Sequence, residues 1–358
     1  MRLIVFSIAF SCTLAFQGRL EAQLERIDVP SGVLRVGAFF SLGNTDSRFN
    51  DGTTESILGP AIPPVIAAES EVNVGVMGLD VGLGIVNRVT IFGRVPLVRY
   101  RSRAIIVSDS APEVRQDTAV TSVGDIEVGA SFTLIDRWDR NETLGGIRTA
   151  VGALIRLPTG EPRNIYDPLD LGTGTGQTDL ALGAVLDWGA GNWGVRFTGG
   201  YTIQFAATVE QAVRSPETPI EPAPVANLRW EPGNVLHLGA RPFFRLARAF
   251  ALQLGATYRV HSEDRYQYAT AGDSIPGLDP AIMSQGTSSS SLVFSGGVSY
   301  SSPSAADPRG KGLPVEAHWT YQVVVASSKG LVPKTTTMRV GLRLYFGLWG
   351  KGSQSDGR

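Results

Sequence analysis

Cysteine is almost absent from this 358-residue sequence, because Cys12 is the only one. A disulfide needs two cysteines and a thiolate metal site needs several, so a single cysteine excludes both. Cys12 also lies in an N-terminal segment that we expect to be removed on export. The mature protein is therefore predicted to contain no cysteine nucleophile.

Charge is also sparse. Charged residues make up 18% of the chain, and the formal net charge is −1. Nucleic-acid binding needs a clustered basic surface, so this balance predicts no nucleic-acid partner. No metal-ligand spacing is visible, and we expect no cofactor. The glycines at residues 172–176 lack the Lys-Ser/Thr of a phosphate-binding loop, and we interpret them as a flexible loop.

Long apolar runs are missing after the first, which covers residues 3–16. Arg2 precedes this run, polar residues follow it, and Ala22 stands at a suitable cleavage position before Gln23. This order is typical of a signal peptide. A membrane-spanning helix needs about 20 apolar residues, which disfavours the alternative of a retained anchor. We therefore expect a signal peptide at 1–22, a mature fold at 23–350 and a polar tail at 351–358.

Apolar residues alternate with small or polar residues in many segments along the chain. Residues 193–205 place W, V, F, G, Y, I and F on one face and G, R, T, G, T and Q on the other. This period of two predicts strands whose two faces meet different surroundings. The same rhythm predicts about twelve strands. They fall near residues 33–42, 70–84, 89–100, 122–135, 144–157, 178–188, 193–206, 233–246, 250–261, 289–300, 313–327 and 335–348.

The connections between these strands alternate between short and long, which is typical of outer-membrane barrels with periplasmic turns and external loops. The fold class predicted is therefore all-β, a transmembrane antiparallel β-barrel of outer-membrane type. Its expected partners are outer-membrane lipid, the barrel assembly machinery and small-molecule solutes. The competing fold is an exported β-sandwich, which seldom needs so many long strands.

Tryptophans give a second indication, because aromatic rings favour the membrane interface. Five of the six fall near predicted periplasmic strand ends, at Trp138, Trp188, Trp193, Trp319 and Trp349. Trp230 is the exception, in a predicted outer loop. Phe346 ends the apolar face of the last predicted strand and resembles the terminal aromatic that serves as an assembly signal.

Two motifs carry a resemblance to a known family. One is VGDIEVGA at residues 123–130, and the other is LPTG at 157–160 followed by LGTG at 171–174 and TDLALG at 178–183. Together they resemble the outer-membrane transporter family associated with the meta-pathway of phenol degradation. The resemblance implies a barrel and the uptake of small, hydrophobic or aromatic compounds. The resemblance identifies no functional residue in this sequence.

Histidine is too scarce to favour an enzyme. The three are His237, His261 and His318, and none begins a His-x-Ser pair that would share one strand face. His318 shares a face with Thr320, a poor substitute for a serine nucleophile. We interpret all three histidines as polar residues of the interior and predict no catalytic site.

Charged side chains on the polar face of each strand are expected to point into the barrel, since an Arg or Lys facing lipid at mid-bilayer costs roughly 2–4 kcal/mol. The predicted lumen-lining residues are Arg148, Arg156, Arg196, Arg241, Arg245, Arg259, Arg339, Arg343, Asp125, Glu127 and Asp179, together with Arg35, Arg94, Asp187 and Glu316. Either they brace a narrow interior as pairs, or they line a water path and set its selectivity.

The sequence thus predicts an outer-membrane channel or transporter for passive uptake of small molecules. The alternatives are a closed barrel that acts through its external loops and, least favoured, an outer-membrane hydrolase.

Overall fold

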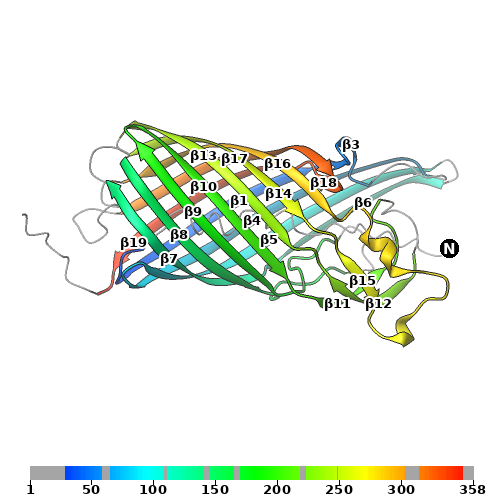
Figure 1. The fold of residues 1–358 in the computed structure, drawn as a ribbon. Helices are drawn as coiled ribbons and strands as arrows, with labels where there is room; N and C mark the ends of the chain where they lie inside the picture. Colours follow the sequence, from blue (N-terminus) through cyan, green and yellow to red (C-terminus); the bar gives the residue numbers. More distant parts are fainter. Residues whose placement is uncertain are drawn as a thin grey trace, which may run out of the picture.

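The computed structural model describes residues 29–58, 65–108, 111–139, 145–164, 170–217, 223–247, 249–302 and 314–349. The wall is a closed antiparallel barrel of twelve strands (Figure 1). These strands are β1 (Val33–Thr45), β4 (Val65–Val86), β5 (Val89–Ser108), β7 (Ile126–Asp139), β8 (Gly145–Leu157), β9 (Asp179–Ala190), β10 (Trp193–Gln204), β13 (Val235–Ala247), β14 (Phe250–His261), β16 (Ser289–Ser301), β17 (Val315–Lys329) and β19 (Thr336–Gly347).

Closure comes from pairing between the first and last strands of the wall. β1 hydrogen-bonds β19 from Val33↔Gly347 to Asn44↔Thr336, and on its other side it pairs with β4. Each remaining strand pairs with the next barrel strand along the chain. A closed antiparallel sheet leaves no unpaired edge for lipid to meet, so every backbone polar group of the wall can be satisfied internally. The predicted fold class is confirmed.

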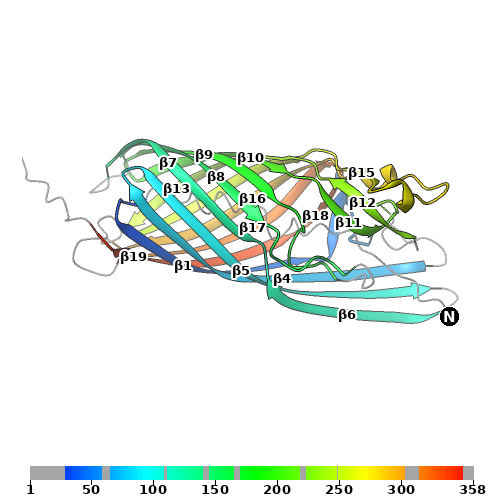
Figure 2. The same cartoon turned by 90° about the horizontal axis from the view of Figure 1, so that it is seen from below.

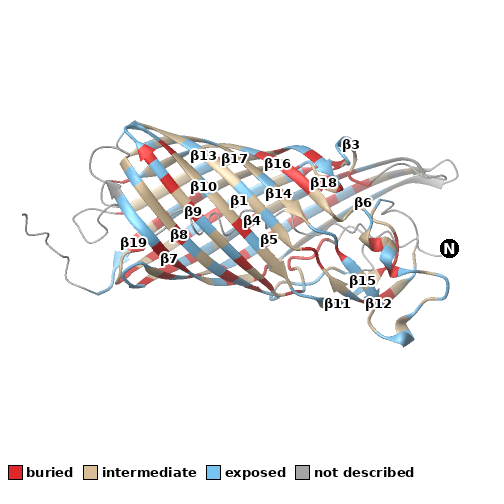
Figure 3. Cartoon of the chain, viewed as in Figure 1, coloured by how far each residue is buried: buried red, intermediate tan, exposed pale blue. Residues whose placement is uncertain are grey.

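The two faces of each strand differ as the alternation predicted. In β14, Leu252, Leu254 and Tyr258 are exposed, and Leu254 reaches 69%, whereas Gln253 and Thr257 between them are half-buried. Figure 3 shows the same interleaving of buried and exposed positions around the wall. Exposed large apolar side chains in such number make a lipid-facing surface rather than a water-facing one. The protein is an outer-membrane barrel.

Aromatic residues mark the end with the short turns. Four of the predicted interfacial tryptophans are exposed there, namely Trp188, Trp193, Trp319 and Trp349. The side chain of Trp138 lies outside the described residues. Because outer-membrane barrels keep their short turns in the periplasm, this end is periplasmic and the opposite end is extracellular.

One predicted strand, 122–135, proves to be two. It breaks at Gly124 and Asp125 into β6 (Ala111–Val123) and β7. β5 pairs with β7 through residues 89–94 and with β6 through 97–108. β4, β5 and β6 therefore continue beyond the barrel as a three-stranded extension (Figure 2).

The long connections contain structure that the alternation did not predict. One small sheet joins β2 (Ser47–Asn50), β3 (Thr53–Ser56) and β18 (Leu331–Pro333), and another joins β11 (Ala207–Ala212), β12 (Val225–Glu231) and β15 (Arg265–Tyr268). Two short 3₁₀ helices, η1 (Ala271–Asp273) and η2 (Pro280–Ser284), follow the second sheet. Leu228 of this second sheet and Met283 of η2 are buried together in a small hydrophobic core. These small sheets and helices thus form a folded layer on the extracellular side of the barrel.

The predicted signal peptide at 1–22, with Cys12 and the cleavage position before Gln23, lies outside the described residues, as does the tail at 351–358. Among the helices that the structure describes, none has the length and hydropathy to cross a membrane.

Candidate functional site in the barrel interior

A row of alternating charge crosses nine neighbouring strands of the wall. Each member is the direct cross-strand partner of the next. In order, the row is Glu316, Arg343, Gly37, Asp80, Arg94, Glu127, Arg156, Asp179 and Gln204. All the charged members except Glu316 are buried. Because opposite charges directly across a ladder attract, this order favours a single strand register.

Ion pairs link members of the row. Arg94 Nη1 lies 3.4 Å from Glu127 Oε2, and Arg156 pairs with Asp179, which also accepts a hydrogen bond from Gln177 Nε2 at 3.0 Å. The guanidinium groups of Arg94 and Arg156 thus each pair with a carboxylate, and these groups are shielded from water within the wall. Such pairing is what permits buried charge at bilayer depth.

Asp80 belongs to this row but was missed by the sequence analysis. Its carboxylate lies 3.4 Å from Arg35 Nη2 and occupies the space in front of Gly37, where an added Cβ would lie 2.3 Å from Asp80 Oδ1. Asp80 alternates with the exposed Leu79 and Val81, so the period-two pattern was sufficient to place it inside.

A second cluster centres on Asp187, which is buried on β9. Arg196 on β10 donates to it from Nε at 2.6 Å and from Nη2 at 2.8 Å, and Arg148 on β8 donates from Nη2 at 3.0 Å. Two guanidinium groups therefore share one carboxylate across three adjacent strands. A bidentate pair of this kind holds the guanidinium group in one orientation and also compensates its charge.

The motif residues gather where the wall breaks between β6 and β7. The Asp125 carboxylate accepts hydrogen bonds from Gly160 N at 3.1 Å, from Thr175 N at 2.9 Å and from Thr175 Oγ1 at 3.0 Å. Gly174 packs against Gly160 so closely that a Cβ on Gly174 would lie 2.5 Å from Asp125 Oδ1 and 2.7 Å from Gly160 Cα. Asp125 thus joins the LPTG and LGTG motifs.

Two threonines of the same motifs complete this junction. Thr159 Oγ1 donates to Gly124 O and accepts from Ile126 N, while Thr173 Oγ1 donates to Val123 O. These bonds tie the β8–β9 connection to the backbone on both sides of the break. We predicted a flexible loop at the glycines of this connection. In the structure Gly174 allows close backbone packing, while Gly176 has open space around it.

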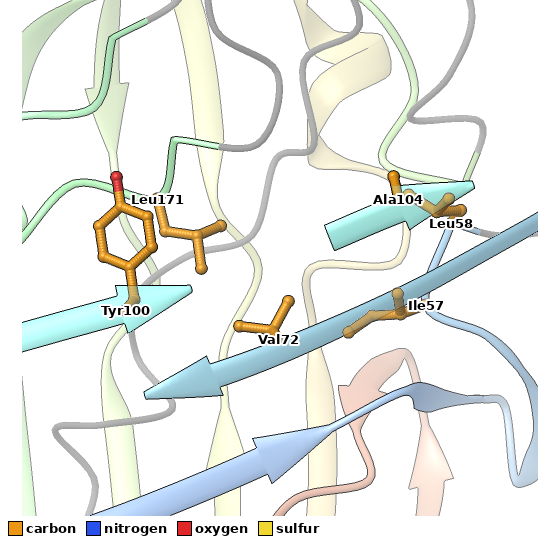
Figure 4. Packing of buried hydrophobic residues seen from close by; sticks show 6 residues of the cluster. All are labelled: Ile57, Leu58, Val72, Tyr100, Ala104 and Leu171. Atoms are coloured by element: carbon orange, nitrogen blue, oxygen red, sulfur yellow. The ribbon is translucent and has the colours of Figure 1, made fainter. Parts of the chain in front are cut away.

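The same connection also folds against the inner wall. Leu171 is buried with Tyr100 of β5 and Val72 of β4, beside Ile57 and Leu58 from the first external connection (Figure 4). The hydroxyl of Tyr100 donates to Asp170. An external connection therefore closes over part of the extracellular half of the barrel.

Next to this closure lies a cavity. The space open to the centre of a water-sized sphere is about 80 Å³. Its walls come from seven barrel strands and include Phe39, Val72, Val74, Val76, Val293, Val324, Gln322, Arg94, Arg259 and Arg339. Among the lining residues there are three arginines and no acidic side chain. At ~10–15 Å³ for each water, the cavity has room for several waters or one small solute.

The predicted interior residues occupy two environments. Asp125, Glu127, Asp179, Arg156 and Arg343 are buried in the row or the junction. Arg148, Arg196, Arg241, Arg245, Arg259 and Arg339 are half-buried. The structure brings Arg259 and Arg339 to one cavity with Arg94.

The histidines are packed as parts of the wall. The rings of His237 and His318 lie over Gly200 and Gly341 on adjacent strands, where an added Cβ would approach each ring to 2.2 Å. His261 Nδ1 lies 2.9 Å from Thr287 O. In the part of the chain that the structure describes, no group of three or more His, Cys, Asp or Glu residues is arranged to hold a metal ion.

Comparison of sequences finds no matching family model and no matching characterised protein. Comparison of folds finds the COG4313 outer membrane channel from Pseudomonas putida F1, with a TM-score of 0.57 at 15% identity, covering 89% of this chain and 97% of that one. The translocator domain of the autotransporter NalP from Neisseria meningitidis has a TM-score of 0.42 at 14% identity, covering 96% and 99%. The CymD monoaromatic hydrocarbon channel has a TM-score of 0.37 at 9% identity, covering 97% and 95%. Only the first exceeds 0.5, and at its low identity it shows the fold.

Proposed function

We propose that this protein is an outer-membrane channel for the passive uptake of small hydrophobic or aromatic molecules. The observation that carries the proposal is the cavity inside the closed barrel, which combines a valine-rich wall with three arginines. Binding sites for small molecules are usually concave, mostly apolar and provided with a few polar groups. The motifs that resemble a family of outer-membrane transporters form the external closure beside this cavity, which supports a transport role rather than a catalytic one.

Conductance in planar bilayers tests the proposal, together with the flux of small aromatic solutes into liposomes that contain the purified protein. We expect discrete conductance steps and faster entry of solutes than into protein-free liposomes. Protein that is folded, as judged by its shifted migration when unheated on gels, yet passes neither ions nor solutes would contradict a channel role.

A second candidate is a closed barrel that acts through its external layer. Two observations favour it, namely the buried row of paired charges and the inward packing of Leu171. Small barrels are often filled by their own side chains. Folded but non-conducting protein would support this second candidate, and release of the Leu171 closure by mutation would then leave the conductance at zero.

A further inference from the structure

Charged and apolar side chains occupy different parts of the cavity wall, and this arrangement restricts the class of ligand that the cavity can bind. Its arginines come from β5, β14 and β19, and its valines come from β4, β16 and β17. Arg94 and Arg339 both lie over the ring of Phe39, with their Cζ atoms 4.6 and 5.3 Å from the ring centroid. Their guanidinium groups therefore converge on one side chain at the cavity wall. Cation–π contacts of this kind hold a guanidinium in a defined orientation.

The charge of this wall favours an anion. None of the residues that line the cavity is acidic, and Arg94 forms an ion pair with Glu127, which does not line the cavity. Fixed positive charge in a confined site with low-dielectric walls raises the local concentration of anions. Arginine also matches a carboxylate in shape, since it can donate two parallel hydrogen bonds.

The remainder of the wall favours an apolar body. Val76 and Phe39 belong to one buried cluster, and Val293 and Val324 belong to another. A solute that is charged throughout would leave these side chains in contact with polar groups. A solute with one compact apolar end would instead remove their surface from water, which is the favourable term in such binding.

We propose that this cavity binds small monocarboxylates with a compact apolar body, with the carboxylate directed to Arg339 and Arg259 and the apolar body directed to the valines. The inference deepens the proposed channel function, on which it rests, by assigning the charge class of the solute. Neutral aromatic compounds of the same size are then the poorer ligands.

Binding of benzoate to the full-length protein in detergent, measured by titration calorimetry, tests this assignment. Benzyl alcohol is the neutral probe of similar shape, and acetate is the carboxylate without an apolar body. We expect benzoate to bind at least tenfold more tightly than either. Arg339→Gln should weaken benzoate binding at least tenfold and leave benzyl alcohol nearly unchanged. Arg101→Gln, on the exposed face of β5, should leave both unchanged.

Two further variants keep the test decisive if Arg339→Gln does not fold. Arg259→Gln should also weaken benzoate binding, and Arg339→Lys should retain part of it, since a point charge remains. Equal binding of benzoate and benzyl alcohol, or unchanged benzoate binding in a folded arginine variant, would overturn the assignment. Benzoate binding without conductance would instead support the site and contradict the channel, so the two proposals fail separately.

Discussion

Each strand of the wall carries two sets of side chains in contrasting surroundings. Exposed leucines, valines and aromatic residues face outward, while arginines, carboxylates, hydroxyls and the valines that line the cavity lie between them on the inner face. Arg94, Arg148 and Arg196 are tolerated there because carboxylates on adjacent strands pair with them, as at Asp187 and Glu127. The cost of a single substitution in folding free energy therefore depends first on whether the side chain faces outward or inward.

The outer face is tested by Leu254→Arg. Leu254 is exposed to lipid, so an arginine there should cost roughly 2–4 kcal/mol of folding free energy in vesicles. Thr257→Arg on the same strand is the matched control, because its side chain points inward, and its cost should be smaller. Urea titration of vesicle-folded protein measures both. Equal costs would mean that the assigned faces of β14 are wrong.

The inner face is tested by Asp187→Asn. This change removes the negative charge that Arg148 and Arg196 share. Breaking a fully buried ion pair costs roughly 3–5 kcal/mol, and because these two arginines are half-buried we expect a cost at the lower end of that range. Asp117→Asn is the control, because Asp117 pairs with Arg101 at an exposed site where ion pairs contribute little. Unfolding titrations of the two variants should differ clearly. A similar small effect in both would show that Asp187 does not brace the wall.

At the scale of elements, the alternation of residues was sufficient to locate the strands of the wall. Each of the twelve predicted segments overlaps a barrel strand, because lipid on one side and a polar interior on the other impose the same period on every strand. The break at Gly124 was not predictable in this way. It depends on hydrogen bonds that the Asp125 carboxylate accepts from Gly160 and Thr175, which lie 35 and 50 residues away and leave no local pattern.

The junction around Asp125 is tested by Gly174→Ala. The new methyl group would meet Asp125 and Gly160 at distances shorter than contact allows, so the β8–β9 connection should loosen. Gly176→Asn is the control, because that position has a φ of +72°, which asparagine tolerates, and open space around it. Trypsin cleavage at Arg163 in folded protein should accelerate in the first variant only. Equal cleavage rates would show that the close packing of Gly174 does not hold the connection.

At the scale of the whole molecule, the barrel combines a braced wall with an arginine-lined cavity in its extracellular half. The charge row crosses the strands from β17 through β1 to β10, while β14 and β16, which lie outside the row, complete the cavity wall. Bracing and selectivity were alternatives for the interior when only the sequence was considered. In the structure, Arg94 belongs to the row and also lines the cavity, while the half-buried Arg259 and Arg339 line the cavity outside the row, where we propose that they favour anions.

Those half-buried arginines lead to the last prediction, which concerns ion selectivity. Arg241 and Arg245 lie on one face of β13, and Arg259 lies on β14 beside it. If the path conducts, their positive charge should enrich anions within it. Substitution of all three with glutamine should lower anion preference, measured as the reversal potential under a salt gradient, while backbone pairing keeps the wall folded.

The effect should shrink as salt rises, because the screening length falls to about 3 Å at 1 M. Substitution of the exposed Arg99, Arg101 and Arg103 with glutamine is the matched control, since it removes the same charge from outside the barrel and should leave the reversal potential unchanged. An open triple variant of Arg241, Arg245 and Arg259 with unaltered selectivity would show that these residues do not line the conducting path. Equal shifts in both triple variants would assign the preference to the field of the whole molecule rather than to the interior.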